Sequence, residues 1–287
     1  MTKNELKELQ KLTYHESRLL SRLLGAFKIK GDIPDGFDVQ YFMLLLFMRG
    51  YAIVTDIDGV KALAGAISGI NYANRPKHFE TTNPDIRNKK GVIGVDGVVV
   101  YPTPYKNYNP LYIRHLISHY SNKLNAIDKS VDISLNNSRI PFIFFAVNEA
   151  EKEQMSKVYD DINSGKPAVV EALDLFNNEK MRALDVKGNY ITDLLLRDEL
   201  TIYNDFLSEV GINNNPIEKK ERLVVGEVES NNDDVEINRL NIIDSIQEGL
   251  DEVNKLYGTN LTVEYATKER NIESENNDNN LSYNDDM

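Results

Sequence analysis

Two histidines four residues apart have the most recognisable metal-binding spacing in this sequence. His115 and His119 would lie one turn apart on one face of a helix, where two imidazoles can hold a zinc ion. Leu116 stands where a zinc protease has its catalytic glutamate, and the chain has no cysteine to supply a thiolate ligand. We therefore expect a histidine pair that is exposed or packed on a helix, and no metal site.

A second candidate is an apolar segment that ends in Asp56, Asp58 and Gly59. It resembles the first motif of the haloacid-dehalogenase-like phosphatases, in which the first aspartate attacks phosphorus and the second acts as acid and base beside magnesium. The late acidic pair of that family should follow a strand, whereas the pairs at 160–161 and 233–234 do not. A hairpin turn explains the motif better. A magnesium-dependent phosphatase that uses Asp56 and Asp58 remains an alternative.

No other motif indicates catalysis or a cofactor. The glycine-rich stretch 65–69 lacks the lysine of a phosphate-binding loop and the spacing of a dinucleotide-binding motif, so we expect its glycines to allow close backbone packing. The four histidines form no recognisable hydrolase triad. The sequence therefore predicts no catalytic residue and no cofactor.

The chain is acidic: 45 aspartates and glutamates against 33 lysines and arginines give a formal net charge of -12. Sequence-specific DNA-binding modules are normally basic, so that class is disfavoured. A small basic cluster, Lys219, Lys220 and Arg222, interrupts a polar stretch and has the composition of a solvated loop. The charged first ten residues and the short apolar run at 41–48 predict neither an export signal nor a membrane span.

The N-terminal part has the pattern of two helices. Leucines at helical spacing over 9–24 predict a helix that stops at Gly25, and residues 28–36 have the composition of a connector. Asp38 is placed to cap a second helix, and Gly50 is placed to end it.

Strand-like segments follow the two helices. Residues 51–63 and 91–101 each predict a hairpin with a primed turn, at Asp58-Gly59 and Asp96-Gly97 respectively. The stretch 71–90 between them is polar and irregular. Together these segments predict a small mixed α/β body.

The second half predicts a long helix, a small module and another long helix. Pro110 opens the first helix, the module has strands at 140–147 and 168–173 around a helix, and the last helix spans 189–210. This order favours an antiparallel helix pair with the module at its far end. The apolar positions expected to pack along the pair are Ile113, Leu116, Ile117, Tyr120, Leu124, Ile191, Leu195, Ile202 and Phe206.

The C-terminal part is more polar. Residues 213–241 have the composition of a mobile loop, 242–257 that of an amphipathic helix, and 261–265 alternate like a strand. The end of the chain, 266–287, is acidic and rich in asparagine, which predicts disorder. The fold class is α+β and mainly helical.

Several segments resemble the upper collar proteins, or portal proteins, of small Picovirinae-type podophages, which are also called head–tail connectors. The most specific block lies between Gly211 and Gly258, and looser matches extend the resemblance over roughly residues 32–265. The matching segments are Gly50-Tyr51, 65–69, Tyr190, 211–214, 218–224, 227–231 and 254–258.

The resemblance implies a portal fold with a wing, two antiparallel stem helices, a small α/β clip and a mobile tunnel loop. Mapped onto this chain, these parts are the wing at 1–109, the stem helices at 110–137 and 188–212, the clip at 138–187, the tunnel loop at 213–241, the C-terminal helix and strand of the wing and crown at 242–265, and the acidic tail at 266–287.

The resemblance also implies a function. Such subunits form a ring of about twelve copies at one capsid vertex, through which double-stranded viral DNA is packaged and ejected. The partners would be major capsid and scaffolding proteins, a packaging ATPase, and lower collar and tail proteins, with no membrane partner. The protein would be made in the host cytoplasm, become part of the virion, and not be an enzyme. A structural tail adaptor that never meets the motor is a further alternative.

For DNA contact, the resemblance implies Lys219, Lys220 and Arg222 in the tunnel loop. Some relatives have lysines along the second stem helix where this chain has Asp185 and Leu194, with Lys187 and Arg197 nearby as possible channel residues. A net charge of -12 per chain would give roughly -144 around the ring, which disfavours tight DNA binding and suits a conduit.

Overall fold

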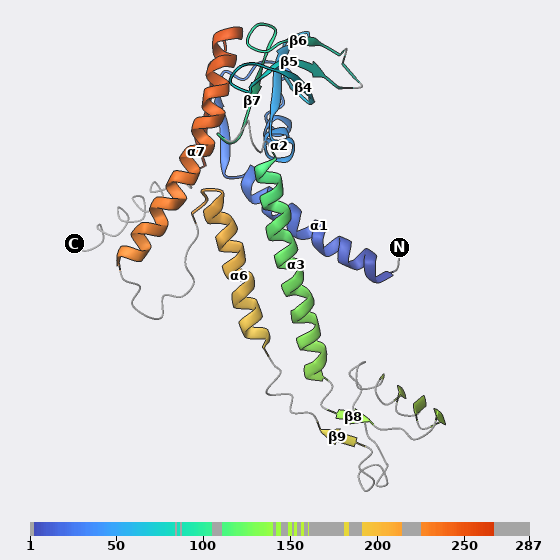
Figure 1. The fold of residues 1–287 in the computed structure, drawn as a ribbon. Helices are drawn as coiled ribbons and strands as arrows, with labels where there is room; N and C mark the ends of the chain where they lie inside the picture. Colours follow the sequence, from blue (N-terminus) through green and yellow to red (C-terminus); the bar gives the residue numbers. More distant parts are fainter. Residues whose placement is uncertain are drawn as a thin grey trace, which may run out of the picture. The chain divides into compact units, whose positions relative to one another are not determined.

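The chain folds into two units, which are described separately (Figure 1). The computed structural model describes residues 3–83, 85–86, 88–104, 111–139, 142–144, 191–213 and 225–266, and short pieces between 149 and 183. The helical unit contains residues 1–19 and 115–235, and the mixed unit contains 20–114 and 236–287. Across the described ranges, no helix has the length and apolar character needed to span a bilayer.

The helical unit is built from α1 (Lys3–Leu24), α3 (Tyr112–Arg139) and α6 (Thr192–Glu209), of which α1 and α3 extend into the mixed unit. The helices predicted at 9–24, 110–137 and 189–210 are confirmed in type and place. After Leu24 the chain turns at Gly25, whose amide donates to the Ser21 carbonyl. This is the stop that the glycine predicts.

The segment between α3 and α6 contains one strand pair in its described part. Strands β8 (Phe142–Phe144) and β9 (Met181–Ala183) run antiparallel, with Phe142 opposite Ala183. The strand predicted at 140–147 is therefore present in part, but its partner is antiparallel and lies near 182. The predicted strand at 168–173 lies outside the described residues.

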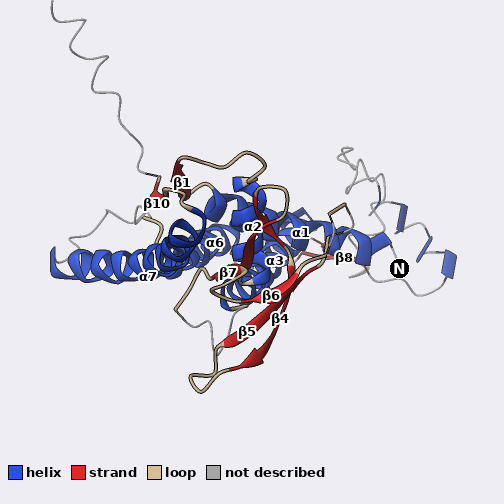
Figure 2. Cartoon of the chain, turned by 90° about the horizontal axis from the view of Figure 1, so that it is seen from above, coloured by secondary structure: helices blue, strands red, loops and turns tan. Residues whose placement is uncertain are grey.

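In its described part, the mixed unit contains three small antiparallel sheets, in the orders β1–β10, β3–β2–β7 and β4–β5–β6. Figure 2 shows β4 and β5 running side by side. Helix α2 and most of α7 complete the unit. The elements are β1 (Phe27–Gly31), α2 (Val39–Arg49), β2 (Ala52–Asp56), β3 (Val60–Leu63), β4 (Gly65–Ile70), β5 (Pro76–Thr81), β6 (Lys90–Val92), β7 (Gly97–Val100), α7 (Val225–Tyr257) and β10 (Leu261–Tyr265).

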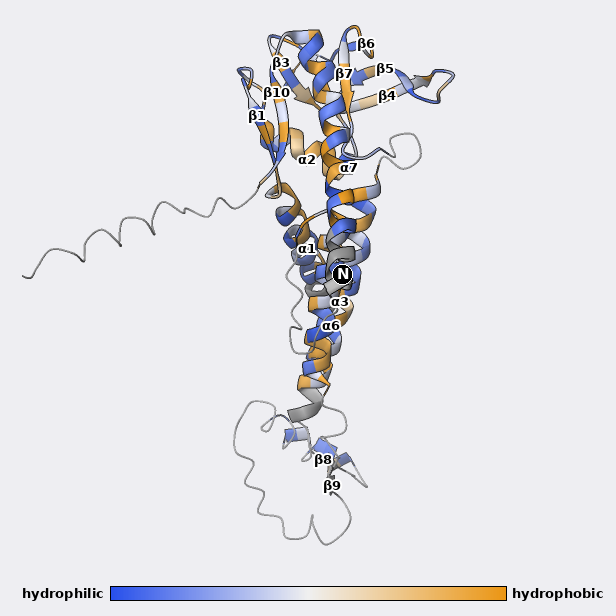
Figure 3. Cartoon of the chain, turned by 90° about the vertical axis from the view of Figure 1, so that its left-hand side faces the viewer, coloured by the Kyte–Doolittle hydropathy of each residue, from blue (hydrophilic) through white to orange (hydrophobic). Residues whose placement is uncertain are grey.

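Helix α2 has the boundaries that its capping residues predict. The Asp38 carboxylate accepts a hydrogen bond from the Tyr41 amide at 3.0 Å, and Gly50 has φ 79°, the left-handed conformation that ends helices. The helix is largely apolar (Figure 3), because it buries five large side chains: Phe42, Met43, Leu45, Leu46 and Phe47.

Two segments expected to be irregular are strands. Residues 27–31, mostly assigned to a connector, form β1 and pair with β10, where Phe27 lies opposite Tyr265. The polar stretch 71–90 contains β5, the central strand of its sheet, which buries Phe79. In both cases the partner strand supplies the backbone hydrogen bonds and decides the structure, which overrides a weak local pattern.

The hairpin predicted around Asp96-Gly97 is wrong. Strand β6 pairs with β5, whereas β7 pairs with β2 in another sheet. Gly97 is the first residue of β7. A Cβ at this position would lie 2.8 Å from the Phe79 ring and 3.0 Å from the Val54 carbonyl oxygen. The glycine is therefore needed for close packing, and the Asp96 carboxylate instead accepts a hydrogen bond from the Val92 amide at 2.7 Å.

Helix α7 begins at Val225, so residues 225–241 are helical and not part of a loop. The Asn- and Asp-rich run at 230–234 lowers helix propensity only modestly, by up to about 0.7 kcal/mol per residue. Val235, directly after that run, is buried. Packing of this kind overrides the polar composition on which the loop prediction depended.

In the mixed unit, α7 lies against β7 and the segments at its two ends. The Ser245 hydroxyl donates to the backbone carbonyl of Tyr101, and the Tyr257 hydroxyl donates to the backbone carbonyl of Asp96, each at 3.1 Å. Between these contacts, a Cβ on Gly249 would lie 2.7 Å from Cγ1 of Val100 and 3.0 Å from its Cα. The absence of a side chain at 249 therefore sets how closely the helix approaches the strand.

We predict that Gly249→Ala destabilises the mixed unit. Alanine favours a helix interior by about 1 kcal/mol over glycine, but overpacking costs about 1–3 kcal/mol. With the Cβ as close as 2.7 Å to Val100 we expect the clash to dominate, with a net loss of up to about 2 kcal/mol. The free energy of unfolding, measured by urea denaturation, checks this. Asp244→Ala, at an exposed position of the same helix, is the control that changes propensity without a clash. Equal or greater stability of Gly249→Ala would contradict the packing argument.

Candidate functional site

Most of the basic residues predicted to contact DNA lie outside the residues that the structure describes. Lys219, Lys220, Arg222 and Lys187 lie among residues that the structure does not describe. Arg197 is exposed on α6. A role for Arg197 in a channel stays a prediction.

The histidine pair is on a helix, as its spacing predicts. His115 and His119 are both exposed on α3, and His119 makes an edge-on contact with the Tyr120 ring. Within the described ranges, no three histidine or carboxylate side chains come together in a group that could hold a metal ion.

Asp56 and Asp58 belong to a hairpin turn. Asp58 has φ 52° and Gly59 has φ 103°, the two positive values of a primed turn, and β2 and β3 pair on either side. The Asp56 carboxylate accepts a hydrogen bond from the Gly59 amide at 2.9 Å. The hairpin interpretation is confirmed, and both strands that pair with β2 are antiparallel to it.

Two lysines stabilise this turn. The Lys61 ammonium donates to the carbonyl oxygens of Ile57 at 2.8 Å and Asp58 at 2.6 Å. Lys89 donates to the Asp56 carbonyl at 2.8 Å. The Asp56 carboxylate and the backbone carbonyls of Asp56, Ile57 and Asp58 are thus occupied in holding the turn, and the phosphatase alternative is not favoured.

The glycine-rich stretch 65–69 forms most of β4. A Cβ on Gly65 would lie 2.5 Å from Cδ1 of Ile53 and 3.0 Å from Cα of Thr81. The prediction of close backbone packing is therefore confirmed for Gly65, and β4 pairs with β5 along its length.

Helices α3 and α6 form an antiparallel pair within the helical unit. At one point the Thr192 hydroxyl donates to the Ser134 hydroxyl at 3.0 Å, and at another the Tyr120 and Phe206 rings meet with centroids 5.7 Å apart. The two contacts are separated by fourteen residues on α3 and by fourteen residues on α6, which corresponds to about 21 Å along each helix axis. The residue numbers rise along one helix as they fall along the other, as in an antiparallel pair. One register therefore satisfies both contacts.

The residues predicted to pack along the pair differ in burial. Most are inaccessible to solvent or nearly so: Ile113, Ile117, Tyr120, Leu124 and Phe206. Leu116, Leu195 and Ile202 are half-buried. Ile191 is 45% exposed, because it precedes the first turn of α6 instead of lying on its buried face.

Helix α1 lies antiparallel to α3 and joins the pair as a third helix. Lys11 pairs with Asp132 at 2.5 Å, and His15 lies 2.9 Å from the Asp128 carboxylate. From the first contact to the second, the residue number rises by four on α1 and falls by four on α3, so the contacts are one helical turn apart. His15 is buried, and no hydrogen-bond partner for its Nδ1 is found within the described ranges.

Arg18 connects α1 to α6. Its guanidinium donates to the Glu199 carboxylate at 2.9 Å and lies 4.4 Å from the centroid of the Tyr203 ring. Burial alone lowers the pKa of Arg18, but the hydrogen bond and negative charge of Glu199 outweigh it and raise the pKa. Sequence reasoning missed this contact, although Lys11, His15 and Arg18 recur at the spacing of one helix face.

One end of the helix pair exposes large apolar side chains. They surround the Ser134–Thr192 hydrogen bond: Ile133 and Leu135 on α3, and Ile191, Leu194 and Leu196 at the start of α6, with exposed fractions between 38% and 59%. We call these five residues the apolar end. A concentration of exposed apolar side chains at one place is typical of a surface that binds another protein.

The two helices also carry opposite charge. The α6 sequence has five acidic residues and one basic residue, whereas α3 has four basic and two acidic residues. The two helices therefore have complementary net charge.

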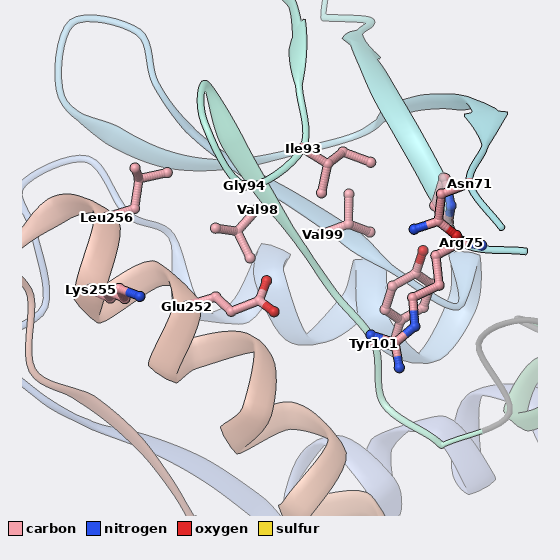
Figure 4. A pocket seen from close by; sticks show the side chains of 11 residues that line it. Asn71, Arg75, Ile93, Gly94, Val98, Val99, Tyr101, Glu252, Lys255 and Leu256 are labelled. Carbon is pink, nitrogen blue, oxygen red and sulfur yellow. Dashed lines mark hydrogen bonds between the residues drawn. The ribbon is translucent and has the colours of Figure 1, made fainter. Parts of the chain in front are cut away.

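The mixed unit contains a cavity of about 520 Å³ between α7 and the strand β7 with its preceding turn (Figure 4). Ile93, Val98 and Leu256 form apolar parts of its wall, and Glu252 projects from α7 toward the strand. Tyr101 lies at one end of the cavity. Burial raises the pKa of Tyr101 to about 12.

The family comparison identifies the class to which this fold belongs. A mainly helical α+β chain with two long antiparallel helices and a separate unit of small sheets has the features expected of a head–tail connector. The model of the family described as Phage Connector (GP10) matches residues 68–271, so the chain belongs to this family. The resemblance to portal, or head–tail connector, proteins of bacteriophages is thereby confirmed.

The chain is also similar to solved structures. One is described as "Portal and tail of native bacteriophage P68"; the alignment covers 98% of this chain and 98% of that chain, with 14% sequence identity and a TM-score of 0.47.

Tyr101 predicts a loss of stability at high pH. An unfolded tyrosine titrates near 10, so below pH 10 both states keep the proton. Between pH 10 and 12 the unfolded chain ionises while folded Tyr101 does not, and the free energy of unfolding should fall by up to about 3 kcal/mol.

Urea denaturation at pH 9 and pH 11 measures this fall. Tyr101→Phe should make it smaller, whereas Tyr51 and Tyr257, whose pKa values burial also raises, should leave part of it in place. Tyr72→Phe, at a fully exposed tyrosine, is the matched control. An unchanged fall in Tyr101→Phe would show that Tyr101 does not cause it.

Proposed function

We propose that the chain is a portal subunit that forms a ring of about twelve copies at one capsid vertex. Double-stranded viral DNA would pass through the ring during packaging and ejection. The ring would bind the capsid shell and scaffolding protein, then the packaging ATPase, and later the lower collar and tail. The ATPase would be a separate chain, and this protein would act as a structural part of the virion.

The parts of a portal can be assigned to the observed elements. We assign the stem to α3 and α6, the clip to the segment that contains β8 and β9, and the wing to the mixed unit. The tunnel loop, expected over 213–241, would be the shorter segment that precedes α7, since helical structure begins at Val225.

The observation that best supports assembly is the apolar end of the helix pair. Its five side chains are left exposed in a single copy, although Ile117, Tyr120, Leu124 and Phe206 of the same two helices are buried. Burying an exposed leucine contributes about 1.5–3 kcal/mol, so a neighbouring copy that covers this end would gain substantial free energy. Contacts of one surface with a different surface of the next copy form a ring when the rotation from copy to copy closes on itself.

The charge of the chain supports a conduit more than a DNA-binding protein. The net charge of -12 opposes tight binding of a duplex, since bound phosphates would resist sliding. Attraction between acidic α6 and basic α3 would favour alternating contacts around the ring. Lys219, Lys220 and Arg222 would provide brief contact with phosphates.

A tail adaptor remains the second structural hypothesis, because it would also form a ring and belong to the virion. Co-purification distinguishes the two roles. A portal ring should retain the packaging ATPase when both are expressed together with capsid proteins, whereas an adaptor should not.

We predict that wild-type protein forms rings and that Leu194→Glu prevents them. A glutamate at a position that is 58% exposed in the single chain should be tolerated by the fold but not by an apolar contact between copies. Native mass spectrometry and negative-stain imaging measure assembly, and circular dichroism verifies folding.

Two controls accompany this variant. Leu194→Met keeps the apolar character and should assemble, and Leu9→Glu changes an exposed leucine of α1 away from the apolar end. Rings formed by Leu194→Glu would remove the apolar end from the interface, and a monomeric wild type at high concentration would oppose the portal proposal itself.

The basic cluster predicts a separable defect. Lys219→Gln, Lys220→Gln and Arg222→Gln together should leave ring assembly intact but weaken the contact with DNA. Each lost phosphate contact should lower the salt dependence of binding by about one unit of slope. Binding of short duplexes to rings at several salt concentrations measures this, and a matched Lys152→Gln, Lys157→Gln variant is the control. An unchanged salt slope would exclude the cluster from DNA contact.

A further inference from the structure

Helix α7 and the sheet β4–β5–β6 lie on opposite sides of the sheet β3–β2–β7 in the mixed unit (Figure 2). Side chains alternate between the two faces of a strand, so Ile53 and Val99, which pair across β2 and β7, share one face, and Val100 points to the other. Ile53 and Val99 form a buried cluster with Phe79 of β5. Val100 lies against Gly249 of α7, where a Cβ would be 2.7 Å from its Cγ1. These elements therefore form three layers, with β3–β2–β7 in the middle.

The face of β4–β5–β6 that points away from the middle layer carries exposed apolar side chains. Phe79 points toward the middle layer, so its neighbours on β5 and their cross-strand partners point outward. Ile70 on β4 is 69% exposed and Val92 on β6 is 43% exposed. We call this surface the outer sheet face; its residues are Ala66, Ser68, Ile70, Pro76, His78, Glu80, Lys90 and Val92. The solvent face of an antiparallel sheet is normally polar, so these apolar side chains indicate a contact surface.

Helix α7 exposes a second surface on the other side of the three layers. Its inner side in the mixed unit is buried and includes Ile246 and Val253. Exposed residues recur at steps of three and four on the opposite side of the helix: Ile237, Leu240, Asp244, Glu248 and Asp251. We call these five residues the outer stripe of α7. The stripe begins with two apolar side chains, continues with three acidic ones, and points away from β7.

The two surfaces are complementary in charge. The described residues of 65–92 have a net charge of +2, from Arg75, Lys77, Lys89 and Lys90 against Glu80 and Asp85. Residues 236–257 of α7 have a net charge of -3, from Glu236, Asp244, Glu248, Asp251 and Glu252 against Arg239 and Lys255. Opposite net charge attracts two surfaces and orients their approach.

The two surfaces also match in length. The fourteen residue steps from Ile237 to Asp251 correspond to about 21 Å of helix, and the six residues of β4 span about 20 Å. A helix stripe and a sheet face of equal length can cover each other, as a helix and a sheet do inside a domain.

We propose that the outer stripe of α7 in one copy packs on the outer sheet face of the next copy. Ile237 and Leu240 would cover Ile70 and Val92, with the acidic part of the stripe beside the basic residues of the sheet. The two surfaces face opposite directions, so one copy can contact a neighbour on each side. Head-to-tail contacts of this kind form a ring when the rotation from copy to copy closes on itself. The proposal rests on the ring proposed above and names one contact that joins its subunits.

Crosslinking tests the contact directly, because the chain has no cysteine of its own. The full-length double variant Val92→Cys, Leu240→Cys is assembled and treated with a short bismaleimide. The two cysteines of one copy lie on opposite sides of the three layers, so a short linker cannot join them. We therefore expect a ladder of covalent oligomers on a denaturing gel.

The controls establish which surfaces meet. Val92→Cys alone and Leu240→Cys alone should stay monomeric after treatment, because neither surface contacts the same surface of another copy. Ile33→Cys with Leu240→Cys moves the first cysteine to another exposed apolar position of the mixed unit, and it should give far less product.

Assembly of single variants gives the second measurement. Leu240→Glu should raise the subunit concentration needed for half-assembly by about tenfold or more, since an unpaired charge destabilises an apolar contact. Leu240 is 46% exposed in the single chain, so the fold should tolerate the glutamate, which circular dichroism verifies. Leu240→Met keeps the apolar character and should assemble like the wild type.

The outcomes separate this inference from the ring itself. Wild-type rings together with a ladder from the double variant alone and weakened Leu240→Glu assembly support the contact. Wild-type rings without that ladder, with covalent dimers from a single variant, with equal product from the Ile33→Cys control, or with normal Leu240→Glu assembly overturn the contact and leave the portal proposal standing. Absence of wild-type rings under all conditions would overturn both.

Discussion

The register between α3 and α6 is the constraint on which the rest of the helical unit depends. A hydrogen bond between Ser134 and Thr192 and a ring contact between Tyr120 and Phe206 are satisfied by one alignment of two antiparallel helices. A slip by one turn would keep the same apolar faces on the seam but would break both contacts. The same alignment places Ile133 and Leu135 beside the start of α6, so the exposed apolar end is a consequence of the register.

Polar contacts give this register much of its uniqueness. Apolar seams tolerate shifted alignments, whereas buried hydroxyl groups must find a partner at a particular height along the helix. Ser134 and Thr192 are both buried and satisfy each other. The Lys11–Asp132 and His15–Asp128 pairs set the register of α1 against α3, and Arg18 connects α1 to Glu199 on α6. The exposed Lys11–Asp132 pair contributes little alone, whereas His15 is buried; together these contacts favour one arrangement of the three helices.

What could be predicted from the sequence was local in origin. Asp38 and Gly50 bound α2 through their own side-chain and backbone geometry, and Asp58-Gly59 makes its turn without distant help. Strand β1 was missed because its partner, β10, lies more than two hundred residues away in the sequence. Gly97 misled for a related reason: its role is to make room for Phe79, a residue of another sheet. The cavity and the outer sheet face were invisible for the same reason, since both depend on strand pairing.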